Sequence, residues 1–313
     1  MATKGMDRIS ISVSNLVDSL AFYRDWIGMR VVARETLEPK QIQQLWNLPP
    51  ETKARAAILK NELQPTLLEL IEFRPRSGRK IREGLRSLDY GLYDIAFLVR
   101  DIEQIYRELT EKGFTFISPP IQYQPNWVPH RVKEMVLIGP DNVRVAHFQR
   151  MKYEEYGVPG NYVKLNHSAQ IVDDTDKAIK FYCDILGLDL ASQVTVPKGL
   201  VDDVIGAPAG TETKLTFITR KDTDTVIMEF VELSLKGKSL APVAKPPNLG
   251  LFMLSFEVDD LSSLMKTLQK EGITVLSGPV EWHTKSSGKM TAITVEGPGG
   301  VMVKLFEREV SEL

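Results

Sequence analysis

The sequence predicts an α+β protein built from four βαβββ modules in tandem, paired into two cup-shaped domains. Three observations predict this fold: the chain contains two similar halves, each half divides again, and the composition is that of a globular protein. At 313 residues, with 43% hydrophobic and 26% charged side chains, the chain is long enough for two domains with sizeable cores.

The two halves share one spacing over more than a hundred residues. The segment from Ile9 to Met29 returns from Ser168 to Leu188, and Phe22-Tyr23 aligns with Phe181-Tyr182, 159 positions later. Later proline, aspartate, glycine and glutamate positions keep an offset of 158 to 160. A constant offset of this length indicates a tandem duplication.

The first unit shows the order of elements within a module. Ile9–Val13 alternates as a strand does, and apolar residues at helical spacing then begin at Leu16. Asn15 is suited to cap that helix, and Gly28 to end it. Three further strands are predicted at Met29–Arg34, Arg55–Leu59 and Thr66–Phe73.

The second unit repeats this order with a strand in DIAFLV and a helix over Ile102–Lys112, and the second half opens strands at His167 and Met253. The segment 151–162 is interpreted as a linker between domains at 1–150 and 163–313. We expect consecutive units to share a cup, because paired units cover each other's open sheet face. Exchange of modules between the halves is the alternative.

Composition limits the partners. A net charge of −2 gives no reason to expect nucleic-acid binding. Cys183 is the single cysteine, which excludes an intrachain disulfide and suits a reducing compartment. No apolar run is long enough to span a bilayer, and the N-terminus lacks a signal-peptide core. The sequence therefore predicts a cytoplasmic protein with no nucleic-acid or membrane partner, and a homo-oligomer stays open.

Two kinds of segment carry a family resemblance. DRISISVSNLVDSLAFYRDWIGM and NHSAQIVDDTDKAIKFYCDILGL resemble the opening of a vicinal oxygen chelate module, and YDIAFLVRDIE with LIGPDNVRVAHF resembles a second module. The resemblance covers essentially the whole chain and implies a two-domain member of the glyoxalase, bleomycin resistance and extradiol dioxygenase superfamily. It implies the fold more specifically than the function, since that superfamily includes isomerases, lyases, dioxygenases and antibiotic-binding proteins.

The resemblance also implies where a metal would sit, because the family's enzymes take one ligand from each first strand and one from each last strand of a module. Carried over residue by residue, these positions are Arg8, Glu69, Asp94 and Ala146 in the first half, and His167, Glu229, Met253 and Lys304 in the second. Few of these side chains are metal ligands. We therefore expect no cofactor. Iron, manganese or zinc stays open, with His167 and Glu229 as its ligands.

A shifted strand would change this assignment. PDNV has no glycine after Asp141, so the following strand could turn His147 inward to form a triad with Glu69 and Asp94. The exchanged pairing is a further alternative, and would join Asp94 with His167 and Glu229.

The candidate chemistry is metal-independent proton transfer next to a carbonyl group, as in an isomerase or lyase. We expect His167 and Glu229 to exchange protons in the second-half cup, with Lys304 stabilising an enolate or carboxylate. A hydrogen-bonded core histidine beside an ion pair is the structural alternative. A binding or resistance protein and a ring-cleaving dioxygenase with unusual ligands are the functional ones.

Two insertions are placed to cover the cups. Residues 41–51 and 201–211 each form a short helix closed by proline, and either cover an apolar or aromatic ligand or fill the core. The expected substrate-binding residues are Arg8, Glu69, Asp94, Trp46, Met253 and Ser255.

Overall fold

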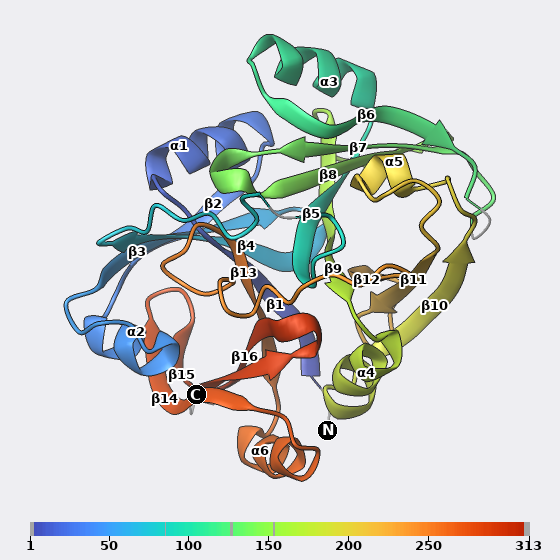
Figure 1. Cartoon of the computed structure of the whole chain (residues 1–313). Helices are drawn as coiled ribbons and strands as arrows, with labels where there is room; N and C mark the ends of the chain where they lie inside the picture. The colour runs from blue at the N-terminus through green and yellow to red at the C-terminus, as the bar shows by residue number, and fades with distance from the viewer. Residues whose placement is uncertain (1–2, 85, 126–127, 153, 310–313) are drawn as a thin grey trace.

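The strands form two eight-stranded sheets in the computed structural model, which describes residues 3–84, 86–125, 128–152 and 154–309. Each sheet curls into a cup, and the predicted βαβββ order recurs four times along the chain (Figure 1). Module 1 comprises β1 (Thr3–Ser12), α1 (Leu16–Leu20), η1 (Ala21–Trp26), β2 (Arg30–Leu37), α2 (Pro39–Trp46), β3 (Lys53–Asn61) and β4 (Gln64–Arg74). Module 2 comprises β5 (Gly91–Val99), α3 (Ile102–Glu111), β6 (Thr115–Tyr123), β7 (Val132–Ile138), η2 (Pro140–Asn142) and β8 (Arg144–Arg150).

The second half repeats the order. Module 3 comprises β9 (Tyr162–Val172), α4 (Thr175–Ile179), η3 (Lys180–Ile185), β10 (Asp189–Val196), α5 (Asp202–Ile205), β11 (Thr213–Thr219) and β12 (Val226–Leu233). Module 4 comprises β13 (Gly250–Val258), α6 (Leu261–Lys270), β14 (Val275–Thr284), β15 (Gly288–Gly297), η4 (Pro298–Gly300) and β16 (Val301–Arg308). Asn15 caps α1 by accepting a hydrogen bond from the Val17 amide, as predicted.

The pairing of modules differs from the one expected. One sheet has the order β14-β15-β16-β13-β1-β4-β3-β2 and joins modules 1 and 4, and the other has the order β10-β11-β12-β9-β5-β8-β7-β6 and joins modules 3 and 2. We call them the 1/4 cup and the 2/3 cup. Neither half of the chain, 1–150 or 163–313, forms a cup by itself. The exchanged arrangement, carried as the alternative, is the one observed.

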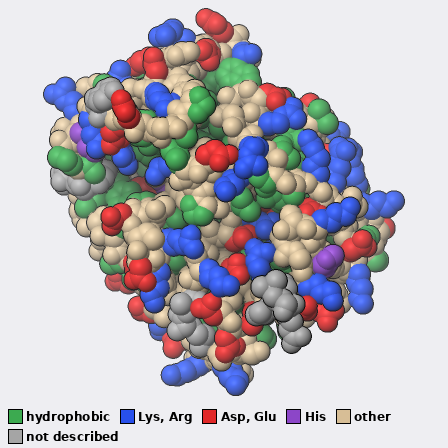
Figure 2. Space-filling view, turned by 180° about the vertical axis from the view of Figure 1, so that it is seen from behind, with side chains coloured by type: hydrophobic (Ala, Val, Ile, Leu, Met, Phe, Trp, Pro, Cys, Tyr) green, Lys and Arg blue, Asp and Glu red, His purple; other side chains and the backbone are tan. Residues whose placement is uncertain are grey.

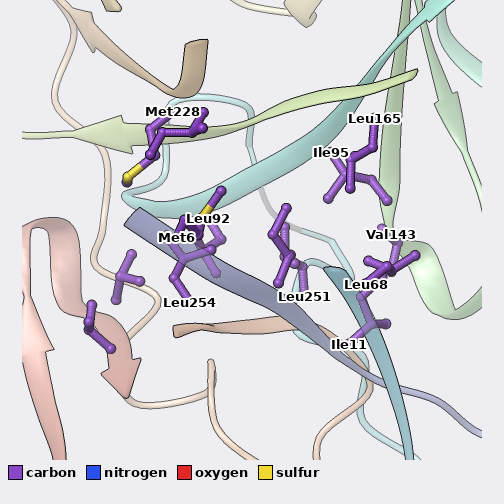
Figure 3. Close-up of a cluster of buried hydrophobic side chains, with 14 of the residues drawn as sticks. Met6, Ile11, Leu68, Leu92, Ile95, Val143, Leu165, Met228, Leu251 and Leu254 are labelled. Carbon is purple, nitrogen blue, oxygen red and sulfur yellow. The ribbon is translucent and has the colours of Figure 1, made fainter. Parts of the chain in front are cut away.

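A shared core explains why this pairing is stable. One face of the central strands of both sheets is apolar and packs between the cups, where side chains from all four modules meet (Figure 3). Ile11, Leu68 and Leu254 come from the 1/4 sheet, and Ile95 and Met228 from the 2/3 sheet. The opposite face of the same strands lines the cups, so each strand separates core residues from site residues by alternation.

Consecutive modules still touch through their helices. Phe22 of module 1 stacks against Phe114 of module 2 at 5.5 Å between ring centres, and η3 of module 3 packs on α6 of module 4. The linkers between modules cross between the sheets and pair at Lys80 with Leu249. Arg82 in the first linker is buried and donates to the Leu92 carbonyl at 2.7 Å, whereas Arg76 and Arg79 of the same linker are exposed.

The surface carries both signs of charge. Lys and Arg side chains lie among Asp and Glu side chains over the face seen in Figure 2. Within the described part of the chain, no helix has the length and apolar character needed to cross a membrane.

Candidate functional site

The 2/3 cup contains a cavity of about 310 Å³. Its walls come from both modules and are mostly apolar, including Phe148, Val201, Val204, Ile205, Leu215, Phe217 and Val231. Helix α5 closes one side and is fixed to module 2 by hydrogen bonds from Tyr93 Oη to the Ile205 carbonyl at 2.6 Å and from Ser118 Oγ to the Val204 carbonyl at 2.8 Å. A concave, apolar cavity with a few polar groups is typical of a small-molecule site.

Three acid–base side chains on adjacent strands, Glu229, Asp94 and His167, line this cavity. Glu229 on β12 and Asp94 on β5 flank Ala169 of β9 in register, and His167 lies two residues before Ala169 on the same face. The alternation of the strands places these polar groups in the cup while their neighbours enter the shared core. The small Ala169 side chain leaves space between the two carboxyl groups.

His167 and Glu229 form a hydrogen-bonded pair. His167 Nε2 lies 3.0 Å from Glu229 Oε2, and the two side chains are 11% and 16% exposed. The Asn166 side chain occupies the other ring nitrogen, with Nδ2 at 2.8 Å from Nδ1. Both imidazole nitrogens are therefore engaged, and Glu229 Oε1 is the oxygen left for a ligand.

The charges around His167 favour its protonated form. Burial alone would lower the pKa of His167, but the hydrogen bond to Glu229 and the charge of Glu229 outweigh it. The carboxylates of Asp94 and Glu134 act in the same direction, and the pKa is raised from its ordinary value. The surroundings therefore strengthen the hydrogen bond between His167 Nε2 and the Glu229 carboxylate.

The surroundings of Asp94 disfavour its charged form. Burial raises the pKa of Asp94 to about 7 against the opposing charge of His167, and Glu229 adds to the rise. Its Oδ1 atom is buried and accepts no hydrogen bond from the described residues. A buried carboxyl of this kind holds its proton up to neutral pH.

Sequence reasoning missed Glu134 and Tyr123. Tyr123 Oη donates to Glu134 Oε2 at 2.7 Å, and both residues line the cavity. Met135 and Leu137 of β7 enter the shared core, so Glu134 must point to the opposite face. Such alternation is also typical of a solvated strand face, and the sequence contains no second signal that would separate the two cases.

Lys304 does not join His167 and Glu229. It lies on β16 in the 1/4 cup, in register with Ser255 of β13, which is in register with Arg8 of β1. The predicted site residues therefore divide between the cups, because modules 3 and 4 do not share a sheet. His167, Glu229 and Asp94 lie in the 2/3 cup, and Arg8, Glu69, Met253, Ser255 and Lys304 in the 1/4 cup.

The 1/4 cup contains an ion-paired core. Arg8 Nη1 donates to Glu69 Oε1 at 3.1 Å and Arg8 Nε to Asp7 Oδ2 at 2.6 Å. Burial and the charge of Arg8 lower the pKa of Lys304 to about 8, and its ammonium lies 5.3 Å from the Trp282 ring centre. These contacts balance the buried charges within the protein itself.

Helix α2 fills the 1/4 cup. Trp46 is 7% exposed and packs edge-on against Phe73, Phe252 and Trp282 at 5.3 to 6.1 Å between ring centres. Ser277 Oγ donates to the Leu45 carbonyl at 2.6 Å, as Ser118 does to α5 in the other cup. Trp46 is therefore part of the core and does not line a ligand cavity. Of the two insertions, α5 borders a cavity and α2 occupies one.

The strand β8 keeps its register. Asp141 and Asn142 adopt positive φ angles of 56° and 64°, the conformation for which a glycine had been expected. His147 is consequently buried away from the cup, 3.0 Å from Tyr162 Oη and 3.1 Å from the Val145 carbonyl. The alternative triad of Glu69, Asp94 and His147 is not formed.

The donor atoms of the 2/3 cup do not match a metal site. Among the described residues, no three His, Cys, Asp or Glu side chains converge in a way that could hold a metal ion. His167 Nε2 is directed at Glu229, and the β8 position carries Ala146, which has no donor atom. As arranged, these side chains are hydrogen-bonded to one another and do not present a donor set that fits a metal.

The cups define the class of protein. The sequence profile of the Glyoxalase/Bleomycin resistance protein/Dioxygenase superfamily matches residues 5–125 and 164–305, and the chain belongs to that superfamily. The resemblance inferred from the sequence is confirmed.

Named proteins similar to this chain include two epimerases and a glyoxalase. The chain is similar to methylmalonyl-CoA epimerase, mitochondrial, of Mus musculus, with 28% identity over 176 residues that cover 56% of this chain and 88% of that protein. The Homo sapiens protein of the same name is 29% identical over 146 residues, covering 46% and 74%. Glyoxalase I from Zea mays has a TM-score of 0.67 at 16% identity, covering 96% of this chain and 92% of that one, which is a likeness of fold.

Proposed function

We propose that the chain is an enzyme that transfers a proton at a carbon next to a carbonyl group in an apolar or aromatic small molecule bound in the 2/3 cup. The observation that carries this is the His167–Glu229 pair on the wall of an apolar cavity. Since two relatives are named as epimerases, an isomerase is favoured within this class.

We assign different roles to the two members of the pair. Glu229 Oε1 faces the ligand and takes the proton as the carbon–hydrogen bond breaks, and the bonding electrons move toward the carbonyl oxygen. His167 is a positioning residue, because both of its nitrogens are engaged. Its Nε2–H group donates to Glu229 Oε2 and so stabilises the carboxylate before the transfer. Return of the proton to the same or a neighbouring carbon completes an isomerisation without an oxidant or reductant.

Exchange of carbon-bound hydrogen for deuterium tests this function. With phenylacetone, acetophenone and 2-phenylpropanal in D₂O, followed by proton NMR, we expect wild-type protein to accelerate exchange of at least one ketone or aldehyde. Glu229→Gln should slow it by about a hundredfold or more while leaving ligand binding in place. The matched control is Glu69→Gln, the equivalent position in the filled cup, which should leave exchange unchanged.

Unchanged exchange in both His167→Ala and Glu229→Gln would sink the catalytic proposal. Tight binding of the same compounds without any exchange would instead favour the binding or resistance protein.

We also expect the purified protein to bind no metal. Protein purified without a metal-affinity tag and incubated with iron(II), manganese or zinc is expected to carry no metal above background in elemental mass spectrometry, because the donor atoms do not converge. Near-stoichiometric metal that is lost in His167→Ala would overturn this expectation and restore a metal-dependent lyase or dioxygenase.

A further inference from the structure

The proposed reaction places negative charge on the carbonyl oxygen. The 2/3 cup also contains a hydrogen-bonded pair, Tyr123 and Glu134, to which the proposed reaction gives no role. Glu134 and Tyr123 lie on β7 and β6, further round the curled sheet from His167, with β5 and β8 between. Both residues line the same cavity as Glu229. The pair is therefore placed to meet a different part of the ligand from the one that Glu229 meets.

The pair is arranged as a donor chain. Tyr123 Oη donates to Glu134 Oε2 at 2.7 Å, and Glu134 Oε1 accepts no hydrogen bond from the described residues. A proton on Oε1 would be presented to the cavity, and the tyrosine hydroxyl behind it would polarise that hydrogen bond.

The surroundings of Glu134 favour its neutral form. Burial raises the pKa of Glu134 to about 7, and the charges of Glu229 and Asp94 add to this rise, while Tyr123 and His167 oppose it. A carboxyl kept neutral among apolar walls acts as a hydrogen-bond donor near neutral pH.

We propose that Glu134, supported by Tyr123, binds the developing oxyanion of the substrate. This inference rests on the proposed function. As Glu229 takes the proton, the electrons of the carbon–hydrogen bond form a carbon–carbon double bond, and the carbonyl electrons move to oxygen. Glu134 donates its hydrogen bond to that oxygen, the part that an electrophile must play in enolate formation.

The test uses a probe and needs no turnover. In Glu229→Gln, the amide imitates the protonated carboxyl left after proton transfer, and 4-nitrophenol serves as the oxyanion probe, its ionisation read from visible absorption. We expect Glu134→Leu in this background to weaken 4-nitrophenol binding about tenfold or more, and Tyr123→Phe to weaken it less. Binding of 4-nitrotoluene, which has the same shape without the oxygen, should stay within about twofold.

Equal losses for both compounds would overturn the inference, because Glu134 would then only shape the cavity. Unchanged 4-nitrophenol binding in Tyr123→Phe and Glu134→Leu would also overturn it, and Tyr123→Phe keeps the test open if Glu134→Leu fails to fold. Unchanged exchange in both His167→Ala and Glu229→Gln would sink the proposed function alone, since 4-nitrophenol binding is measured without turnover.

Discussion

Trp46→Ala is expected to destabilise the protein by about 3–5 kcal/mol, because it removes the side chain that fills the 1/4 cup. The indole is 7% exposed and contacts Phe73, Phe252 and Trp282. The free energy of unfolding, measured by chemical denaturation, would give the loss. Binding of 4-nitrophenol in the 2/3 cup should not change, since the two cups are formed by different sheets.

Leu63→Ala is the matched control, and added indole provides a rescue. Leu63→Ala removes a side chain that is 42% exposed in the same module and should cost less than about 0.5 kcal/mol. Added indole should restore part of the stability of Trp46→Ala, because dry apolar cavities bind ligands of matching shape. Equal stability of the two variants would show that Trp46 does not fill the cup.

The repeat and the strand alternation predicted the fold and the placement of side chains on the strands. A duplication of constant offset fixes which residues are equivalent, and alternation fixes which face each strand turns to the cup. For this reason Glu69 and Glu229 were correctly placed at equivalent positions beside Ser10 and Ala169. These are local properties of the chain, and local patterns are sufficient to predict them.

Module pairing is not a local property. The first strands of all four modules carry similar apolar faces, so β1 can meet β13 or β5 without a change in pattern. The choice depends on the core shared between the sheets and on linkers that cross between them. The expected association of Lys304 with His167 therefore failed, although both side chains were placed correctly on their own strands.

Whether residues 41–51 cover a ligand or fill the 1/4 cup is likewise not a local property of the sequence. An amphipathic segment such as residues 41–51 can cover a ligand or replace one, and its sequence is the same in either case. Its packing against β14 and β15 of module 4 decides the matter (Figure 1).

Asp94→Asn is expected to stabilise the protein above pH 7 and to have little effect below about pH 4. Burial raises the pKa of Asp94 from 3.8 to about 7, so the folded protein keeps a proton that the unfolded chain has released. The stability that this carboxyl contributes is therefore complete at low pH and is lost as the pH rises through about 7. The difference between these pKa values corresponds to a gain of at most about 4 kcal/mol.

Denaturant unfolding of both proteins between pH 4 and pH 8 would measure the gain, with Asp224→Asn in an exposed turn as the control that should stay within about 0.5 kcal/mol. Asp94→Asn would be less stable than wild type at pH 8 if a positive charge, that of protonated His167 or of a bound ion, balanced the carboxylate charge. Such a loss, removed by a chelator, would identify that charge as a bound metal. The sign of the stability difference and its response to the chelator together separate the proton-holding cup from a metal-holding one, without knowledge of the substrate.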